Sequence, residues 1–156
     1  MDEAGNAYIG NFGFNTYAGE GIKPTNLILV RPGEDPVVAA DDLLFPNGTV
    51  ITPDNETLIV GETYAARLTA FDKAEDGSLN NRRIWADLKE NAEEGPVPLP
   101  DGICIDEEGA IWVASPSTSE VIRVHEGGEI SERIAVETNA FACMLGGCLL
   151  YTSPSP

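Results

Sequence analysis

Two short tripeptides place an oxygen-bearing side chain between a proline and a glycine. They are Pro46-Asn47-Gly48 and Pro100-Asp101-Gly102. An amide carbonyl and a carboxylate are hard oxygen ligands that suit Ca²⁺, Mg²⁺ or Mn²⁺, and a carboxylate also suits Zn²⁺. Beside a cation-bound water, Asp101 could act both as a ligand and as the general base. The same tripeptides are common turn sequences, because proline presets φ and glycine accepts positive φ, so a purely structural role stays open.

An internal repeat relates the two tripeptides. Each one is followed by an apolar strand, an acidic turn and a second apolar strand, within residues 45–60 and 99–113, and a partial third copy opens the chain. The turns carry aspartates that stand 52 residues apart, at Asp2, Asp54 and Asp106. A repeat of about 50 residues built from short strands is typical of a β-propeller blade. Asn47 and Asp101 would then hold equivalent places in successive blades and converge on the central channel.

Short strands separated by turns dominate the whole sequence. Eleven segments are apolar or β-branched and are bounded by turn residues, namely 7–10, 26–30, 36–39, 50–52, 57–60, 67–72, 82–87, 102–105, 111–114, 120–125 and 130–136. This pattern predicts an all-β fold. A β-sandwich fits the strand count but does not explain the repeat, so we expect about three blades of a propeller, a fold that closes with about four to eight.

Three other polar residues are candidates for contact with a small-molecule substrate. Glu62 follows an apolar strand and could face the channel, while Asn15 and Glu20 lie in a glycine-rich stretch that could line a substrate entrance. A histidine-based catalytic triad is not indicated, because the sequence has no Gly-x-Ser-x-Gly motif and a single histidine, His125.

Composition narrows the class of protein and its partners. The 156 residues suffice for one ordinary domain, and a formal net charge of −17 argues against a nucleic-acid partner. No apolar run approaches the ~18 residues of a membrane-spanning helix, so no membrane partner is expected. Three cysteines without paired spacing indicate reduced thiols and favour a cytoplasmic location. The sequence leaves the oligomeric state open.

Six motifs together carry a family resemblance. They include Gly5-Asn6-Ala7-Tyr8-Ile9-Gly10-Asn11-Phe12-Gly13-Phe14 and Pro100-Asp101-Gly102-Ile103-Cys104-Ile105-Asp106, with further stretches at 45–63, 67–72, 76–86 and 140–147. These motifs resemble the gluconolactonase / senescence marker protein (regucalcin) / luciferin-regenerating enzyme family. The resemblance covers residues 1–147, which we expect to form a partial propeller domain. Residues 148–156 resemble a translated sequencing adapter, so a non-native tail is expected there.

The resemblance implies a fold, a cofactor and a reaction. The family is a six-bladed propeller that holds one divalent cation (Ca²⁺, Zn²⁺, Mn²⁺ or Mg²⁺) and hydrolyses sugar lactones. Asn47 matches the family's Asn-Gly ligand and Asp101 its Pro-Asp-Gly ligand, whereas the family's Glu and its Asn-Asp pair have no counterpart here. We therefore expect part of a metal-dependent lactonase whose partner is a sugar lactone. A non-catalytic calcium-binding or regulatory propeller, and a truncated fragment without function, are the alternatives.

Overall fold

The computed structural model describes residues 1–90 and 95–146 and consists mainly of antiparallel sheets. The first sheet contains β1 (Ala7–Ile9), β2 (Thr25–Val30) and β3 (Val37–Leu43). The second contains β4 (Pro46–Ile51), β5 (Thr57–Glu62), β6 (Arg67–Lys73) and β7 (Leu79–Asp87). The third contains β8 (Ile103–Ile105), β9 (Ile111–Ser115), β10 (Glu120–Val124) and β11 (Ile130–Ala135). Two short 3-10 helices, η1 (Thr16–Ala18) and η2 (Thr63–Ala65), complete the described elements.

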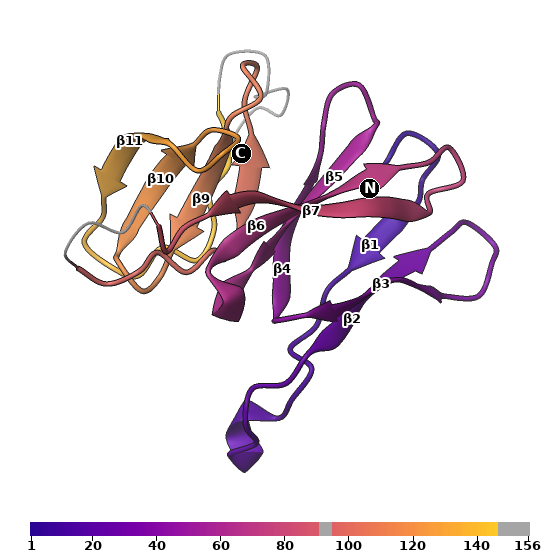
Figure 1. Cartoon of the computed structure of the whole chain (residues 1–156), viewed down its shortest axis with the longest axis horizontal. Helices are drawn as coiled ribbons and strands as arrows, with labels where there is room; N and C mark the ends of the chain where they lie inside the picture. Colours follow the sequence, from indigo (N-terminus) through magenta and orange to yellow (C-terminus); the bar gives the residue numbers. More distant parts are fainter. Residues whose placement is uncertain (91–94, 147–156) are drawn as a thin grey trace, which may run out of the picture.

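Each sheet is built from strands that are consecutive in the chain, as expected of a propeller blade. Figure 1 shows the three sheets side by side, with the second between the other two. Each of the eleven predicted strands has its counterpart in the structure, so the prediction of an all-β fold with about three blades is confirmed. Within the described residues, no helix has the length and apolar character needed to cross a bilayer.

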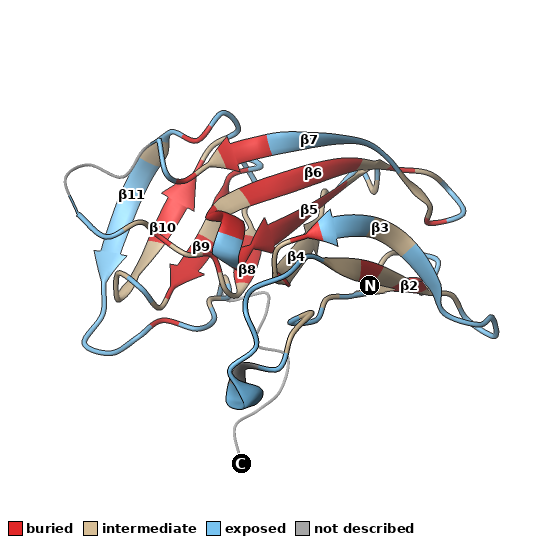
Figure 2. Ribbon diagram, turned by 60° about the horizontal axis from the view of Figure 1, so that its bottom comes forward, coloured by how far each residue is buried: buried red, intermediate tan, exposed pale blue. Residues whose placement is uncertain are grey.

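Apolar clusters on both sides of the second sheet form the core. Successive side chains of β5 point to opposite faces, as the pleat of a strand requires. Leu58 and Val60 belong to the cluster shared with the first sheet, whereas Ile59 belongs to the cluster shared with the third. Figure 2 shows the buried residues concentrated on the middle strands, while the outer strand β11 is largely exposed. Both faces of the second sheet therefore carry buried apolar residues, and packing on both sides fixes its position between the neighbouring sheets.

The inner strand of the second sheet begins earlier than the sequence predicts. β4 starts at Pro46 and not near residue 50, so Asn47 and Gly48 lie within a strand and the turn interpretation of this tripeptide is wrong. The Gly48 N–H donates to the Asp101 carbonyl at 3.0 Å, which brings the start of the third sheet against β4. A Cβ at position 48 would lie 2.4 Å from that carbonyl oxygen. Glycine is required here by a close approach of two backbones.

The repeated turns are not spaced as their aspartates suggest. The Asp2 and Asp106 carboxylates each accept two backbone N–H bonds within their own turn, and their own N–H groups bond to the carbonyl four residues ahead. In the second sheet Thr52 takes this place, because its N–H donates to the Thr57 carbonyl, and Asp54 lies two residues further on. Equivalent positions are thus 50 and then 54 residues apart, so the prediction that Asp54 is equivalent to Asp2 and Asp106 is wrong.

Candidate functional site

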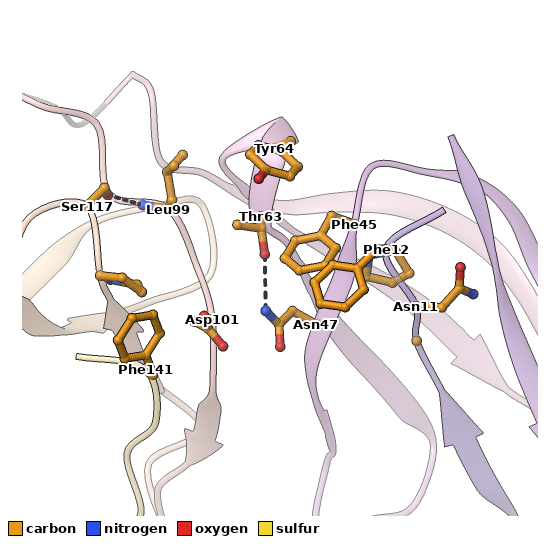
Figure 3. Close-up of a pocket in the computed structure, with 13 residues that line it drawn as sticks. Asn11, Phe12, Phe45, Asn47, Thr63, Tyr64, Leu99, Asp101, Ser117 and Phe141 are labelled. Carbon is orange, nitrogen blue, oxygen red and sulfur yellow. Dashed lines mark hydrogen bonds between the residues drawn. The ribbon is translucent and has the colours of Figure 1, made fainter. Parts of the chain in front are cut away.

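A pocket of about 580 Å³ is lined by residues that flank strands of all three sheets. Its walls come from residues 10–12, 45–47, 63–64, 99, 101, 116–117 and 141 (Figure 3). Asn47, on β4, and Asp101, just before β8, both line it, and in Figure 3 their side chains extend into the same opening. The structure therefore brings together the two residues that the repeat pairs, because the backbone bond between Gly48 and Asp101 holds their segments side by side.

The charge of Asp101 is uncompensated within the pocket. Burial raises the pKa of its carboxyl above the ordinary value, and the nearby Asn47 amide offsets part of that rise. No Lys, Arg or His among residues 1–90 and 95–146 forms an ion pair with it. A partly buried carboxylate beside an amide oxygen is a site that a hard cation would stabilise.

These two residues fit a divalent cation in kind, but they supply only part of a coordination shell. Ca²⁺ takes about six to eight oxygen ligands. Across the described part of the chain, no group of three or more His, Cys, Asp or Glu side chains is placed to hold a metal ion. Asn47 and Asp101 would therefore hold a cation together with water or with oxygens from outside the described residues.

A buried hydroxyl connects the two tripeptides. Thr63, at the start of η2, is buried and donates to the Pro100 carbonyl at 2.7 Å. The same oxygen accepts a bond from Asn47 Nδ2 at 3.4 Å (Figure 3). Sequence reasoning missed Thr63, since nothing in its local pattern shows that it reaches a residue 37 positions away.

Aromatic rings form one wall of the pocket beside Asn47. Phe12 and Phe45 stack with ring centroids 4.5 Å apart, and Phe45 contacts Tyr64 at 5.4 Å. Phe12 is 57% exposed, so the wall presents apolar surface to a molecule that enters the pocket. These rings come from three separate segments, and no sequence periodicity marks them as neighbours.

Phe141 stands on the opposite side, beside Asp101 (Figure 3). The Gly102 N–H donates to the Phe141 carbonyl at 3.0 Å, which repeats the bond from Gly48 to Asp101. Phe141 therefore occupies the third equivalent place after Asn47 and Asp101. Its segment lacks the Pro-x-Gly signature, which is why the repeat did not reveal it.

Asn15 and Glu20 lie in a self-contained loop around η1. The Glu20 carboxylate accepts from the Asn15 N–H at 3.1 Å and pairs with Lys23 at 2.8 Å, while Asn15 Oδ1 accepts from the Ala18 N–H. Both residues are exposed and neither is among those that line the pocket. Their contact with a substrate stays a prediction.

Glu62 is fully buried at the end of β5 and is likewise not among the residues that line the pocket. Its carboxylate pairs with Arg67 at 2.8 Å and with Arg82 at 3.3 Å. It also accepts bonds from the Thr69 hydroxyl and the Leu44 N–H. Desolvation alone would raise the pKa of Glu62, but these donors outweigh it and the pKa lies below the ordinary value. The contacts tie the end of the first sheet to the second, and a substrate role for Glu62 stays a prediction.

Comparison with known proteins gives relatives that are longer than this chain. Regucalcin from Xenopus laevis is 30% identical over 125 residues, which are 78% of this chain and 40% of that protein. Regucalcin from Danio rerio is 32% identical over 96 residues, which are 61% of this chain and 31% of that protein. The chain thus spans less than half the length of these curated relatives.

Solved structures share the fold. A luciferin-regenerating enzyme matches with a TM-score of 0.80 at 20% identity, over 94% of this chain and 48% of that one. A gluconolactonase from Xanthomonas campestris matches with a TM-score of 0.61 at 30% identity, over 76% and 37%. A calcium-binding protein, regucalcin, from Agrobacterium tumefaciens matches with a TM-score of 0.72 at 22% identity, over 90% and 45%.

One family model spans nearly the whole chain. The model described as the SMP-30/Gluconolactonase/LRE-like region matches residues 1–152. This match extends past residue 147 into the segment predicted to be a tail, which lies outside the described residues. The protein belongs to the SMP-30/Gluconolactonase/LRE-like family.

Proposed function

We propose that the chain carries part of a cation-dependent site that opens a lactone ring, with a sugar lactone as the substrate class. One observation carries the proposal: Asn47 and Asp101, from successive sheets, present hard oxygens to one pocket, and the carboxylate has no cationic partner among the described residues. Membership of a family that includes a gluconolactonase supports the reaction. Ca²⁺, Zn²⁺, Mn²⁺ or Mg²⁺ would be held by these two side chains.

The side chains of the pocket have distinct roles in this reaction. A bound divalent cation would polarise the ester carbonyl and lower the pKa of a bound water. Asp101 would accept a proton from the attacking water while the water oxygen bonds to the carbonyl carbon. The ring C–O bond then breaks, and the Asp101 carboxyl returns the proton to the leaving alkoxide, which yields a hydroxy acid.

The aromatic wall would exclude water and pack against the apolar C–H face of the substrate ring. Phe12 and Tyr64 both border the pocket beside Asn47, so a ring lying on them would be held close to the candidate cation ligands. Burial of such a face adds about 25 cal/mol per Å² of apolar surface.

Calcium binding without catalysis is the second candidate. The same pair of oxygens supports it, and one neighbour of this fold is called a calcium-binding protein. The two functions differ in whether a lactone bound in the pocket is opened.

Proton release from glucono-δ-lactone, followed with a pH indicator, tests the proposal. The chain is stripped of metal with EDTA and then supplied with each of the four cations. We expect cation-dependent turnover that Asp101→Asn lowers by about a hundredfold or more, because a general base contributes about 10²–10⁴-fold. Asp54→Asn is the matched control, since Asp54 is exposed in a turn beyond the far end of β4. Calcium binding without turnover would favour the second candidate, and the absence of both would refute the proposal.

A further inference from the structure

The hydroxyl of Thr63 has a single proton, and two distances indicate which neighbour receives it. Thr63 Oγ1 lies 2.7 Å from the Pro100 carbonyl oxygen, the usual distance for an O–H···O bond, and the contact is buried. Asn47 Nδ2 is further away, at 3.4 Å. The proton is therefore committed to Pro100, the residue before Asp101.

This commitment decides how the Asn47 amide is turned. A hydroxyl that has given its proton away can only accept, and of the two ends of an asparagine amide only the NH₂ donates. Asn47 must therefore direct its NH₂ at Thr63. Its carbonyl oxygen Oδ1 then faces the pocket, as Figure 3 shows.

The opposite orientation would disable the site. The Asn47 amide lines the same pocket as the Asp101 carboxylate. An amide released from Thr63 could turn its NH₂ fully onto that carboxylate. The NH₂ would then take the place of a cation, and Oδ1 would point away from the pocket.

We propose that Thr63 is a positioning residue, which keeps the Asn47 carbonyl oxygen directed at the cation site by holding the amide NH₂. This inference rests on the proposed function, since it concerns the same two cation ligands. The hydroxyl is itself held in place on both sides. The Thr63 N–H donates to the Phe45 carbonyl at 3.1 Å, and the preceding residue is the fully buried, multiply bonded Glu62.

Cation affinity measures this role without any turnover. Free Mn²⁺ is titrated by electron paramagnetic resonance against the full chain and its variants. Thr63→Val keeps the shape and removes the hydroxyl, so we expect Mn²⁺ affinity to fall about tenfold or more, as is usual for partners that orient a ligand. Thr63→Ser keeps the hydroxyl and should bind within about threefold of the wild type. Thr52→Val removes a hydroxyl beyond the far end of β4 and serves as the matched control.

A double-mutant cycle with Asn47→Asp separates orientation from a general structural effect. A carboxylate has two equivalent oxygens and needs no orientation, so in that background Thr63→Val should change Mn²⁺ affinity less than about threefold. An equal loss in both backgrounds, or no loss in either, would overturn the inference. If Thr63→Val does not fold, Thr63→Ala takes its place in the same cycle. A wild-type chain that binds no Mn²⁺ overturns this inference and the proposed cation site together, whereas wild-type binding with an inert Thr63→Val overturns the inference alone.

Discussion

Replacing Gly48 by alanine tests the close approach of the second and third sheets. The added methyl would lie 2.4 Å from the Asp101 carbonyl oxygen and 2.6 Å from the Ile103 nitrogen, and neither backbone atom can swing aside. To restore an ordinary van der Waals contact, β4 and β8 must separate by about 1 Å. The Gly48–Asp101 hydrogen bond of 3.0 Å would then be too long to persist.

The expected loss of stability follows from these two changes. Overpacking of a close contact costs about 1–3 kcal/mol. Leaving the two backbone groups unsatisfied costs about 1–3 kcal/mol more. We therefore expect Gly48→Ala to lower the free energy of unfolding by about 2–6 kcal/mol. Because the separation also moves Asn47 away from Asp101, any cation-dependent turnover should fall about a hundredfold.

Urea unfolding followed by tryptophan fluorescence, to which Trp85 and Trp112 contribute, measures this loss. Trp85 is buried in the cluster that joins the second and third sheets, so it reports on the contact that the methyl would open. Gly21→Ala is the control, since a Cβ at Gly21 meets nothing within 4 Å and its φ is not positive. That variant should stay within about 0.5–1 kcal/mol of the wild type. A Gly48→Ala chain that is equally unperturbed would refute the reasoning.

Two further predictions concern pH. Glu62→Gln should lower the free energy of unfolding by about 1–3 kcal/mol at pH 7, because the Arg67 and Arg82 donors lose their charged acceptor. The pKa of Glu62 is lowered in the folded state. The difference in unfolding free energy between the wild type and Glu62→Gln should therefore be complete above the ordinary glutamate pKa and should shrink as pH falls through the folded-state pKa. An equal difference in urea unfolding at pH 7 and pH 3 would contradict this prediction. Asp101→Asn should have the opposite effect, because a raised pKa means that stability is lost as pH rises through the folded-state value. In thermal melts with EDTA the variant should match the wild type at pH 3 and exceed it at pH 7, and a lower Tm at pH 7 would count against the assignment.

Local patterns predicted most of the fold. Short apolar or β-branched segments bounded by turn residues predicted every described strand, and the repeat paired Asn47 with Asp101. Both signals are carried by residues close together in the chain, which is why the sequence alone could reveal them.

Contacts between sheets account for what the sequence could not predict. The tripeptide around Asn47 has residues that are common in turns, but hydrogen bonding to the start of the third sheet keeps it in β4. Thr52 replaces the repeated aspartate because its hydroxyl also accepts a bond, from the Thr57 N–H, so a search for aspartates misses it. The aromatic wall and Thr63 act across separate segments, and no local pattern records such contacts.

Because β5 is buried on both faces, its apolar residues alone do not fix its register against the neighbouring strands. Leu58 and Val60 face one apolar cluster and Ile59 faces another. A shift of the strand register by one residue would therefore only exchange apolar side chains between two apolar environments. Glu62 removes this degeneracy, because the same shift would carry its charge away from Arg67 and toward the opposite, uncharged face. A buried ion pair adds little net stability. Here the ion pair instead selects the register of β5, because only one register pairs the Glu62 carboxylate with Arg67. In that register the hydroxyl of the next residue, Thr63, lies at the pocket.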